Sequence, residues 1–352
     1  MTEGTLPATM QALVWEAPRT MVMRTQALPQ LRPEEALLRV AYAGICGSEL
    51  SGYLGHNALR VPPLVMGHEF SGHVVALGAE AQAINPELAL GSRVTVNPMV
   101  FCRTCAYCLQ GQTHLCVNRR LIGAHRPGAF AEYLAVPAWQ VIPLPETLTD
   151  REGALAEPVA CGVRIAEWAG KVAGERVLIV GAGTIGLVTL QVLQLHGAAE
   201  VFVVETNPER REVAAALGGS VLDPKETDVV KHVRGASGGG VRVAIDAVGR
   251  AITREQCISS TRAGGSVLLS GLHEESSVIP VADIIRREIT VHGTFCYTQA
   301  NVIEAVELLA KRAIRLDPWV TEAPLAEGGM WFDRLIDQIS TAAKVLLIPS
   351  EL

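Results

Sequence analysis

The sequence has no run of about 20 uninterrupted apolar residues, the length that a membrane-spanning helix needs. The most apolar segment, 177–195, contains three glycines and two glutamines, which predicts a short buried strand followed by a helix. The N-terminus lacks the basic and then apolar arrangement of a secretory signal. We therefore expect no membrane association and a cytoplasmic protein.

An excess of positive charge is also missing. The 30 Lys and Arg residues are outnumbered by 36 Asp and Glu residues, and the formal net charge is -6. Such a chain offers no extended basic field for a polyanion, so the sequence predicts a small-molecule partner and no nucleic acid. With 49% hydrophobic and 19% charged residues, the composition is that of a globular α/β protein.

The length of 352 residues suggests about two domains with a cleft between them. Residues 10–136 contain short β-like runs broken by Gly and Pro, which predicts a β domain. A helix follows, at whose start Thr149 and Glu152 are spaced as a capping box. From Glu175 onward, short apolar strands alternate with helices, as in a doubly wound parallel sheet. The alternating apolar residues of 342–352 predict a final strand that returns to the β domain.

A glycine-rich turn lies between a predicted strand and a predicted helix. Its glycines permit a tight turn and a close approach of a pyrophosphate to the positive end of the helix. A purely structural turn is the alternative, but an acidic residue about 20 residues further on favours a nicotinamide dinucleotide. The cofactor contacts expected in the turn are Gly181, Gly183, Thr184, Ile185 and Gly186.

That acidic residue is Glu205, which also bears on the choice of cofactor. A carboxylate accepts a hydrogen bond from the ribose hydroxyl of NAD and repels the additional phosphate of NADP. NAD is therefore the predicted cofactor. Arg210 and Arg211 leave NADP as the less favoured alternative, because they could meet a phosphate or simply face solvent. The remaining expected cofactor contacts are Arg210, Val248, Leu272 and Thr294.

Four of the eight cysteines fall within residues 102–116, in the pattern C-x2-C-x2-C-x7-C. The long chain without a secretory signal favours metal binding over disulfides. The last spacing and the valine after the fourth cysteine do not match an iron-sulfur motif. A site with four sulfur ligands has no open position, so we expect a structural zinc. Its predicted ligands are Cys102, Cys105, Cys108 and Cys116.

A second set combines a thiol, an imidazole and carboxyl groups: Cys46 in GICGSE, His68 and Glu69 in MGHEFSG, and Glu157 in LAEPVACG. Such a mixed set can leave a position for a substrate, as Lewis-acid chemistry requires. Each residue taken alone has a plain structural interpretation, as a core cysteine, a buried histidine or a surface charge. Together they predict an open, catalytic metal site.

These motifs resemble the zinc-containing medium-chain alcohol dehydrogenase superfamily along nearly the whole chain. The segments GICGSE, GHEFSGHVVALG, the four-cysteine segment, GAFAEYLAVP, LAEPVACG and GAGTIG occur in the family's order and spacing. GHEFSG, the Glu-Pro pair, SGLH and KVLLIP are similar to the polyol branch, which includes sorbitol, threonine and galactitol-1-phosphate dehydrogenases. The resemblance implies a GroES-like β domain, at 1–157 and 298–352, and a Rossmann domain at 158–297.

The resemblance further implies a zinc-dependent enzyme that oxidises a secondary alcohol with NAD, with two zinc ions per chain. Cys46, His68 and Glu157 are the implied protein ligands of the catalytic zinc. Glu69 is implied as a direct ligand or as a group that exchanges with water, and Cys161 is a less favoured ligand. Relatives form dimers or tetramers, so we expect a homo-oligomer.

The proton path is less complete than in the family. Ser48 occupies the position of the relay hydroxyl in relatives, whereas Ser51 stands where several polyol relatives have a histidine. His56 is nearby in the sequence and could substitute for it, or be an ordinary surface residue.

Two alternatives to this function remain at this point. They are a zinc-free quinone reductase of the same fold and a zinc-stabilised binding or regulatory protein without catalysis. The substrate is not identified by the sequence. A basic segment could approach a sugar phosphate or face solvent, and a polyol or cyclitol would fit as well. Its residues are Arg119, Arg120, His125 and Arg126.

Overall fold

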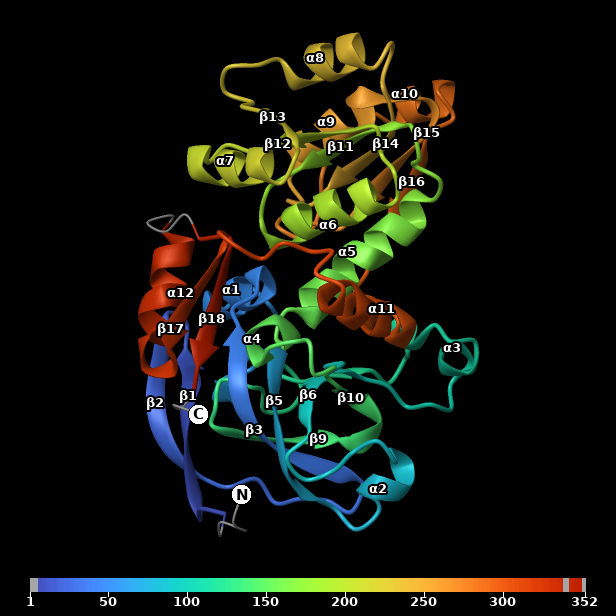
Figure 1. The fold of residues 1–352 in the computed structure, drawn as a ribbon. Coiled ribbons are helices and arrows are strands. Elements are labelled where there is room, and N and C mark those ends of the chain that lie inside the picture. The colour runs from blue at the N-terminus through green and yellow to red at the C-terminus, as the bar shows by residue number, and fades with distance from the viewer. Residues whose placement is uncertain (1–5, 338–341, 350–352) are drawn as a thin grey trace. The chain divides into compact units, whose positions relative to one another are not determined.

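The computed structural model describes residues 6–337 and 342–349 (Figure 1). Contacts within it divide the chain into two units. The β unit contains the described residues up to Glu157 together with those from Val320 onward, and the nucleotide-binding unit runs from Pro158 to Trp319. The second boundary lies later than the residue 298 expected from the sequence, because the helix Gln299–Ala310 groups with the nucleotide-binding unit.

The β unit is built on two main sheets. A three-stranded sheet has the order β2-β1-β4, and a larger sheet has the order β10-β6-β5-β3-β18-β17 with β9 paired to β3. A short hairpin, β7 and β8, carries the basic segment. The strands are β1 Thr9–Ala17, β2 Thr20–Ala27, β3 Glu35–Gly44, β4 Leu64–Val65, β5 Glu69–Leu77, β6 Arg93–Val96, β7 Met99–Val100, β8 Arg120–Leu121, β9 Tyr133–Pro137, β10 Val141–Pro143, β17 Val320–Pro324 and β18 Lys344–Ile348.

Short helices connect these strands. Thr149 caps α4 and forms the predicted capping box with Glu152, so this prediction is confirmed, although the expected single helix is divided into α4 and α5. The helices are α1 Gly47–Tyr53, α2 Ala81–Ile84, α3 Ala106–Leu109, α4 Asp150–Gly153, α12 Gly328–Ile336 and α5 Ala156–Ala169, whose first two residues belong to this unit, with 3-10 turns η1 Thr113–Leu115, η2 Ala138–Gln140 and η3 Leu325–Glu327.

The core of the β unit joins segments that are far apart in the sequence. Trp15, Phe70 and Phe130 are buried in it together with Phe332 of α12. The described part of the predicted final strand is β18, which pairs in antiparallel register with β3, so its return to the β domain is confirmed. The C-terminal segment is thereby part of the same core as the first strands.

The nucleotide-binding unit is a six-stranded sheet in the order β13-β12-β11-β14-β15-β16, and every neighbouring pair is parallel. This order, with the first strand β11 in the middle, is that of a doubly wound dinucleotide-binding fold. The predicted fold class is confirmed. The strands are β11 Arg176–Val180, β12 Glu200–Val204, β13 Ser220–Leu222, β14 Val241–Asp246, β15 Thr261–Leu269 and β16 Thr290–Gly293.

Helices follow the strands of this sheet and pack on it (Figure 1). Because each parallel strand is buried by its neighbours and by helices, the strands are nearly continuous runs of Val, Ile and Leu. Leu178, Phe202, Ala244 and Val267 form the centre of the core. The helices are α6 Thr184–Leu195, α7 Pro208–Ala216, α8 Val229–Ala236, α9 Ala251–Ser260, α10 Val281–Arg286 and α11 Gln299–Ala310.

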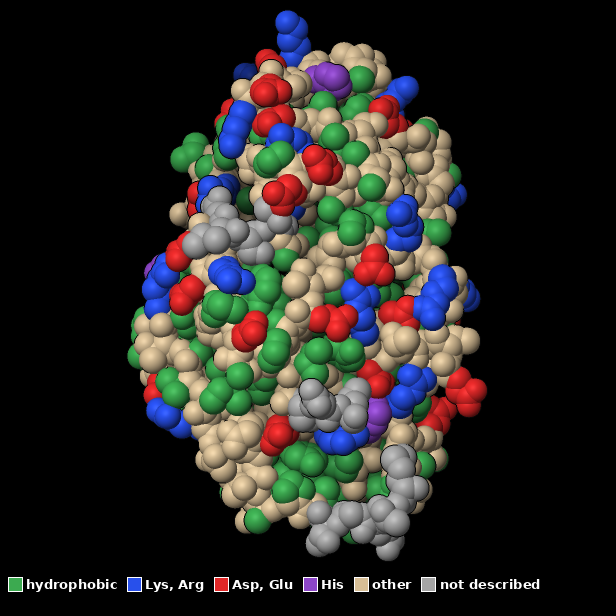
Figure 2. All heavy atoms as spheres, turned by 60° about the vertical axis from the view of Figure 1, so that its left-hand side comes forward, with side chains coloured by type: hydrophobic (Ala, Val, Ile, Leu, Met, Phe, Trp, Pro, Cys, Tyr) green, Lys and Arg blue, Asp and Glu red, His purple; other side chains and the backbone are tan. Residues whose placement is uncertain are grey.

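Among the described residues, no helix is both long and apolar enough to cross a membrane. The face drawn in Figure 2 carries acidic and basic side chains interspersed with hydrophobic ones, as the mixed composition implies.

Candidate metal centres and cofactor site

The candidate catalytic metal site lies where β3 ends and β5 begins. Cys46 follows β3 and is the N-cap residue of α1, while His68 and Glu69 stand at the start of β5. One ligand atom from each of these three residues lies within 4.8 Å of the other two. Atoms this close can share one zinc ion, whose bonds to sulfur, nitrogen and oxygen are about 2.0–2.3 Å long. The donor set therefore fits zinc.

His68 is fixed by a carboxylate that the sequence interpretation did not single out. Glu49 is fully buried, and its Oε1 lies 2.7 Å from His68 Nδ1. Its oxygens also accept hydrogen bonds from the backbone of Cys46, at 3.1 Å, and of Gly67, at 2.8 Å. With Nδ1–H directed to Glu49, the other ring nitrogen keeps its lone pair for a metal.

The charges of this pair are coupled. Burial alone would lower the pKa of His68, but Glu49 and Cys46 raise the pKa well above 6.5. Burial alone would raise the pKa of Glu49, but His68 and then Arg60 outweigh it, and the pKa is lowered. The spacing Cys46-x-x-Glu49 is the signal that could have identified Glu49.

Glu69 is held by a buried lysine from the last strand. Lys344 Nζ lies 2.7 Å from Glu69 Oε1 and 2.5 Å from Oε2, and it donates to the backbone oxygen of Ile45 at 2.9 Å. Both side chains are almost fully buried. Burial alone would lower the pKa of Lys344, but Glu69 and Cys46 raise it above 10.5. Lys344 was missed because its partner lies at the other end of the sequence.

Glu157 does not join the group formed by Cys46, His68 and Glu69. It lies in the first turn of α5 and is 7% exposed. Its charge also acts on Lys344, where it contributes to the raised pKa after the larger effects of Glu69 and Cys46. The predicted role of Glu157 as a ligand, and that of Cys161 as an alternative, stay predictions.

Ser48 lies beside the candidate metal ligand. Its hydroxyl is exposed and lies 3.5 Å from Cys46 Sγ. Arg60 donates to Ser48 from the other side, at 3.3 Å from Oγ. Ser51 lies further along α1, and His56 is an exposed loop residue, whose backbone donates to Ser51. The structure thus gives Ser48 a charged neighbour.

The four cysteines predicted to hold a structural zinc come together in the loop after β7. Their sulfur atoms all lie within 4.8 Å of one another. The Sγ atoms of Cys102 and Cys108 are 3.9 Å apart, and those of Cys105 and Cys108 are 3.5 Å apart. Backbone and hydroxyl hydrogen bonds from Thr104 lower the pKa of Cys102 to about 5. The arrangement can enclose one ion with four sulfur ligands.

The basic segment is only partly available for a ligand. Arg126 forms an ion pair with Glu35 at 2.7 Å and donates to the backbone oxygen of Ala135 at 2.8 Å, so it has a structural role. Arg119 and Arg120 are exposed. Arg126 therefore stabilises the fold, and the other basic residues of the segment are the candidates for binding a ligand.

The glycine-rich turn connects β11 to α6 in the nucleotide-binding unit. Gly181 has a φ of +104°, and Gly183 is the N-cap residue of α6. A Cβ atom at Gly186 would lie 1.9 Å from the backbone oxygen of Gly181, so no side chain fits there. Thr184 and Ile185 form the first turn of α6. The backbone amides at this helix start can approach a pyrophosphate.

Glu205 follows β12, and its carboxylate contacts the glycine-rich turn. Its Oε2 accepts a hydrogen bond from the Ala182 backbone at 2.9 Å, and its Oε1 accepts one from Asn207 at 2.9 Å. Arg211 is held by an ion pair with Asp223 at 2.8 Å, so it is not a simple solvent-facing residue. The Thr206 hydroxyl donates a third bond, to Oε1 at 3.2 Å. A carboxylate has about four acceptor positions, which leaves Glu205 able to bind a hydroxyl group.

The other expected cofactor contacts differ in position. Val248 approaches the turn, since its Cγ2 lies 2.7 Å from the place of a Cβ on Gly181. Thr294 is 9% exposed and its backbone donates to Leu269, whereas Leu272 is 83% exposed. Arg210 lies in the first turn of α7. Their contacts with a cofactor stay predictions.

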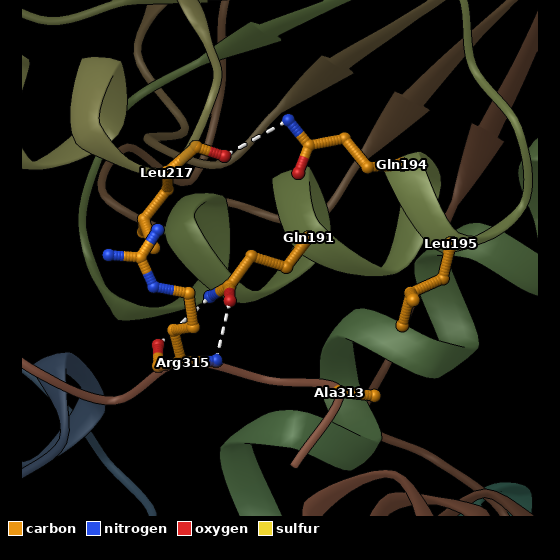
Figure 3. Close-up of a pocket in the computed structure, with 6 residues that line it drawn as sticks. All are labelled: Gln191, Gln194, Leu195, Leu217, Ala313 and Arg315. Carbon is orange, nitrogen blue, oxygen red and sulfur yellow. Dashed lines mark hydrogen bonds between the residues drawn. The ribbon is translucent and has the colours of Figure 1, made fainter. Parts of the chain in front are cut away.

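A separate hollow of about 320 Å³ lies at the other end of α6 (Figure 3). Gln191 and the backbone of Arg315 exchange two hydrogen bonds, at 2.7 and 3.2 Å, and Gln194 donates to the backbone of Leu217 at 3.0 Å. Gln191 attaches the segment after α11 to α6, and Gln194 attaches the end of α7 to it. The lining residues are Gln191, Gln194, Leu195, Leu217, Ala313 and Arg315. The hollow is a feature of packing, distant along α6 from the glycine turn.

The β unit with two sets of metal ligands, together with the dinucleotide-binding sheet, defines the class of zinc-dependent nicotinamide dehydrogenases. Comparison with known sequences gives the same class. The family described as the alcohol dehydrogenase GroES-like domain matches residues 32–146, and the zinc-binding dehydrogenase family matches residues 184–311.

Individual relatives extend the match over nearly the whole chain. The L-galactonate-5-dehydrogenase of Escherichia coli K12 is 32% identical over 91% of this chain and 94% of its own length. The L-threonine 3-dehydrogenase of Pyrococcus abyssi is 34% identical over 84% of this chain and 85% of its own length. A solved protein of Sinorhizobium meliloti 1021, described as a zinc-binding dehydrogenase bound to NADP, superimposes with a TM-score of 0.88 at 34% identity, over 97% of this chain and all of that one.

The chain therefore belongs to the family of zinc-binding alcohol dehydrogenases. It is an oxidoreductase that acts on the CH–OH group of an alcohol. The predictions of the superfamily and of the dehydrogenase function are confirmed, and the alternative of a regulatory protein without dehydrogenase activity is not supported.

Proposed function

We propose that the protein oxidises a secondary alcohol of a polyol, sugar alcohol, sugar acid or cyclitol with NAD, at a zinc ion held by Cys46, His68 and a carboxylate. The observation that carries this proposal is the convergence of Cys46, His68 and Glu69 within 4.8 Å, with Glu49 bound to the back of His68. When bound, zinc supplies Lewis acidity that lowers the pKa of an alcohol, and NAD accepts a hydride.

The protein's own residues prepare the site. Cys46 and His68 provide a thiol and an imidazole, and Glu49 fixes the orientation of that imidazole. Lys344 balances the charge of Glu69 and keeps both Glu69 oxygens occupied. The family resemblance implies Glu157 as the third ligand and leaves Glu69 as a direct ligand or an exchanging group. Because Lys344 already holds both Glu69 oxygens, we propose that Glu69, which lies in the group with Cys46 and His68, is the group that exchanges.

The choice of carboxylate can be tested by metal analysis. Glu157→Gln should reduce the zinc content by about one ion per chain, since a catalytic zinc keeps only three protein ligands. Glu69→Gln should retain the zinc. The reverse result would assign the ligand to Glu69.

The second zinc is proposed for the four-cysteine loop. Wild-type protein should contain about two zinc ions per chain, on the basis of one closed and one open site. Cys105→Ser should lose one ion and much of the stability of the loop. A wild-type content of about one ion per chain would contradict the proposal of two zinc sites.

Ser48 is proposed to pass the alcohol proton toward solvent. Ser48 is exposed, and its hydroxyl accepts a hydrogen bond from Arg60 and donates one to Cys46 Sγ, which places the hydroxyl between a candidate metal ligand and solvent. Ser48→Ala should lower kcat by roughly 100-fold or more, the usual contribution of a positioned proton-transfer group, whereas Ser48→Thr should retain most activity. Equal turnover of Ser48→Ala and wild type would exclude this route.

NAD is proposed over NADP because of Glu205. The carboxylate lies against the glycine-rich turn, where it would accept a bond from a ribose hydroxyl and repel a phosphate. Glu205→Ser should lower kcat/KM for NAD about tenfold or more. The ratio of kcat/KM for NAD to kcat/KM for NADP should fall as well. Glu209→Ala, a change at an exposed acidic residue in the first turn of α7, is the matched control. A wild-type preference for NADP would contradict the assignment.

The central experiment is a screen of NAD reduction by the zinc-loaded protein. It should cover sugar alcohols, their phosphates, sugar acids, threonine and cyclitols. The relatives named above act on L-galactonate and L-threonine, both secondary alcohols that carry a carboxylate. Absence of NAD and NADP reduction with every compound, in protein of full zinc content, would contradict the proposed function.

The assembly is proposed to be a homodimer or homotetramer in the cytoplasm. The edge strand β16 exposes Val291, and the preceding helix α10 exposes Val281 and Ile285. An edge strand with exposed apolar side chains invites pairing with a second copy. Val291→Lys should shift the protein toward the monomer in analytical ultracentrifugation.

A further inference from the structure

Arg60 is a buried cation that no carboxylate of the described residues pairs with. Its exposed fraction is 4%. The guanidinium donates to the Ser48 backbone oxygen at 3.2 Å and to Ser48 Oγ at 3.3 Å, and its buried Nε has no hydrogen-bond partner. The oxygens of Glu49 are instead bound by His68 and by backbone amides. The charge of Arg60 acts on buried Glu49, but the guanidinium makes hydrogen bonds only to neutral oxygens of Ser48 and keeps one donor unused, so an anionic group that accepts from it would be stabilising.

The position of Arg60 is built into α1. A Cβ atom at Gly52 would lie 2.6 Å from Arg60 Cδ, so the helix leaves space for the arginine chain where any side chain would displace it. Ser48, on the same helix, connects Arg60 to the candidate metal ligand Cys46 through contacts of 3.3 and 3.5 Å. The cation is thus fixed next to the place where the alcohol reacts.

The hairpin of β7 and β8 adds further donors. Arg120 Nη2 donates to the backbone oxygen of His125 at 3.2 Å, and the Leu121 backbone donates to His125 Nδ1 at 3.0 Å. That bond makes Nδ1 the acceptor, so the other ring nitrogen of a neutral imidazole carries the hydrogen.

Three arginines act on the charge of His125. Burial lowers its pKa, and the charges of Arg120, Arg119 and Arg60 lower it further. The charged groups that lower this pKa are all arginines. The loop that carries His125 is also held against the metal site, because the Ala129 backbone donates to the Gly67 backbone oxygen at 2.9 Å and the Gly67 backbone donates to Glu49 at 2.8 Å. Arg60 and this loop therefore border the same region.

We propose that Arg60, Arg120 and His125 form a subsite for the anionic end of the substrate, a carboxylate or phosphate carried by the polyhydroxy chain whose alcohol is oxidised. This inference rests on the proposed function, because it places the anion beside the same metal site. Guanidinium groups bind carboxylate and phosphate oxygens through two parallel hydrogen bonds. Arg60 supplies the buried charge, and Arg120 and His125 supply donors at the surface.

The test compares three substrates with one carbon skeleton: a hexitol, the corresponding hexonate and the hexitol 1-phosphate. In wild-type protein, kcat/KM should be highest for at least one of the two charged compounds. Arg60→Met should lower that kcat/KM roughly 10- to 100-fold more than it lowers the value for the hexitol, as expected for loss of a charge-assisted contact. Arg60→Lys should lose less of this kcat/KM than Arg60→Met. Comparison of the hexonate with the hexitol 1-phosphate shows whether the subsite prefers a carboxylate or a phosphate.

Arg24→Met is the matched control, because it removes an arginine of the same unit that pairs with Glu16 at the surface. It should leave the ratio of charged to neutral substrate unchanged. If Arg60→Met lowers kcat/KM by the same factor for all three compounds, Arg60 supports only Ser48 and Glu49, and the subsite is excluded.

Two further measurements test the anion subsite even if Arg60→Met does not fold or the protein oxidises none of the alcohols. Arg120→Gln changes an exposed residue and serves as the test if Arg60→Met does not fold. It should lower the ratio of kcat/KM for the charged substrate to kcat/KM for the hexitol. Binding of inorganic phosphate can be measured by the shift in thermal unfolding midpoint, without turnover. The shift should be smaller in Arg60→Lys and Arg120→Gln than in wild type, and equal shifts would overturn the subsite even if no alcohol is oxidised.

Discussion

Replacing Lys344 by Met should destabilise the β unit strongly. The lysine is 2% exposed, and its ammonium group contacts both oxygens of Glu69, at 2.7 and 2.5 Å, and the backbone oxygen of Ile45. Lys344→Met would leave the Glu69 carboxylate buried without its counter-charge. Removing one partner of such a pair typically costs about 3–5 kcal/mol.

The double variant Glu69→Gln/Lys344→Met separates the cost of the stranded charge from the value of the pair. It should recover most of the lost stability, because pairs replaced as a whole are often nearly neutral. Lys311→Met is the control: its partner Glu307 is one helical turn away, and both side chains are more than half exposed. That exposed pair should contribute no more than about 0.5 kcal/mol.

Urea unfolding of zinc-loaded protein, followed by tryptophan fluorescence, measures these changes. With a slope of roughly 3 kcal/mol/M, the Lys344→Met midpoint should fall by about 1 M or more. A loss of less than about 1 kcal/mol, or a double variant as unstable as the single one, would refute the reasoning. Either result would mean that Glu69 gains another partner or enough water when the lysine is removed.

Three further outcomes are expected. Gly186→Ala should abolish NAD binding in a fluorescence titration, because its Cβ would lie 1.9 Å from the Gly181 backbone oxygen; unchanged binding would contradict the tight turn. Burial and the hydrogen bond to Asp333 raise the Tyr53 pKa to about 12, so its stabilising effect is complete below pH 10 and lost as the pH rises through 12. The stability difference between wild type and Tyr53→Phe should shrink over that interval, and a constant difference would argue against the shift. Asn207→Ala, which removes the N-cap of α7, should cost about 1 kcal/mol in thermal unfolding, whereas no loss would show that the cap is replaceable.

The residues that the sequence identified share one property: their spacing along the chain reflects a local structure. The four cysteines lie in one loop, and Gly181 to Gly186 form one turn, so their patterns were informative without long-range contacts. Cys46 and His68 required the resemblance to a family, because 21 intervening residues separate their motifs. The structure then brought them together at the ends of β3 and β5.

The residues that were missed depend on contacts between distant segments or on unfilled space. Lys344 meets Glu69 across 275 residues. Arg60 becomes notable only because Gly52 leaves it room and, in the part of the chain that the structure describes, no carboxylate forms a hydrogen bond with it. The second unit boundary was displaced for the same reason, since the apolar face of α11 does not reveal which core it joins. Sequence patterns specify local geometry well, and they carry little information about partners chosen by packing.

The pairing of β18 with β3 has a consequence for biosynthesis. The candidate metal site contains residues made early, yet the lysine that balances Glu69 is near the end of the 352-residue chain. A ribosome-bound chain that ends before β18 would therefore expose an uncompensated carboxylate and an unpaired strand edge. The nucleotide-binding unit is continuous in sequence and can fold during translation, whereas the β unit must await its last strand. The order of synthesis thus delays completion of the metal site until the dinucleotide-binding sheet has been made.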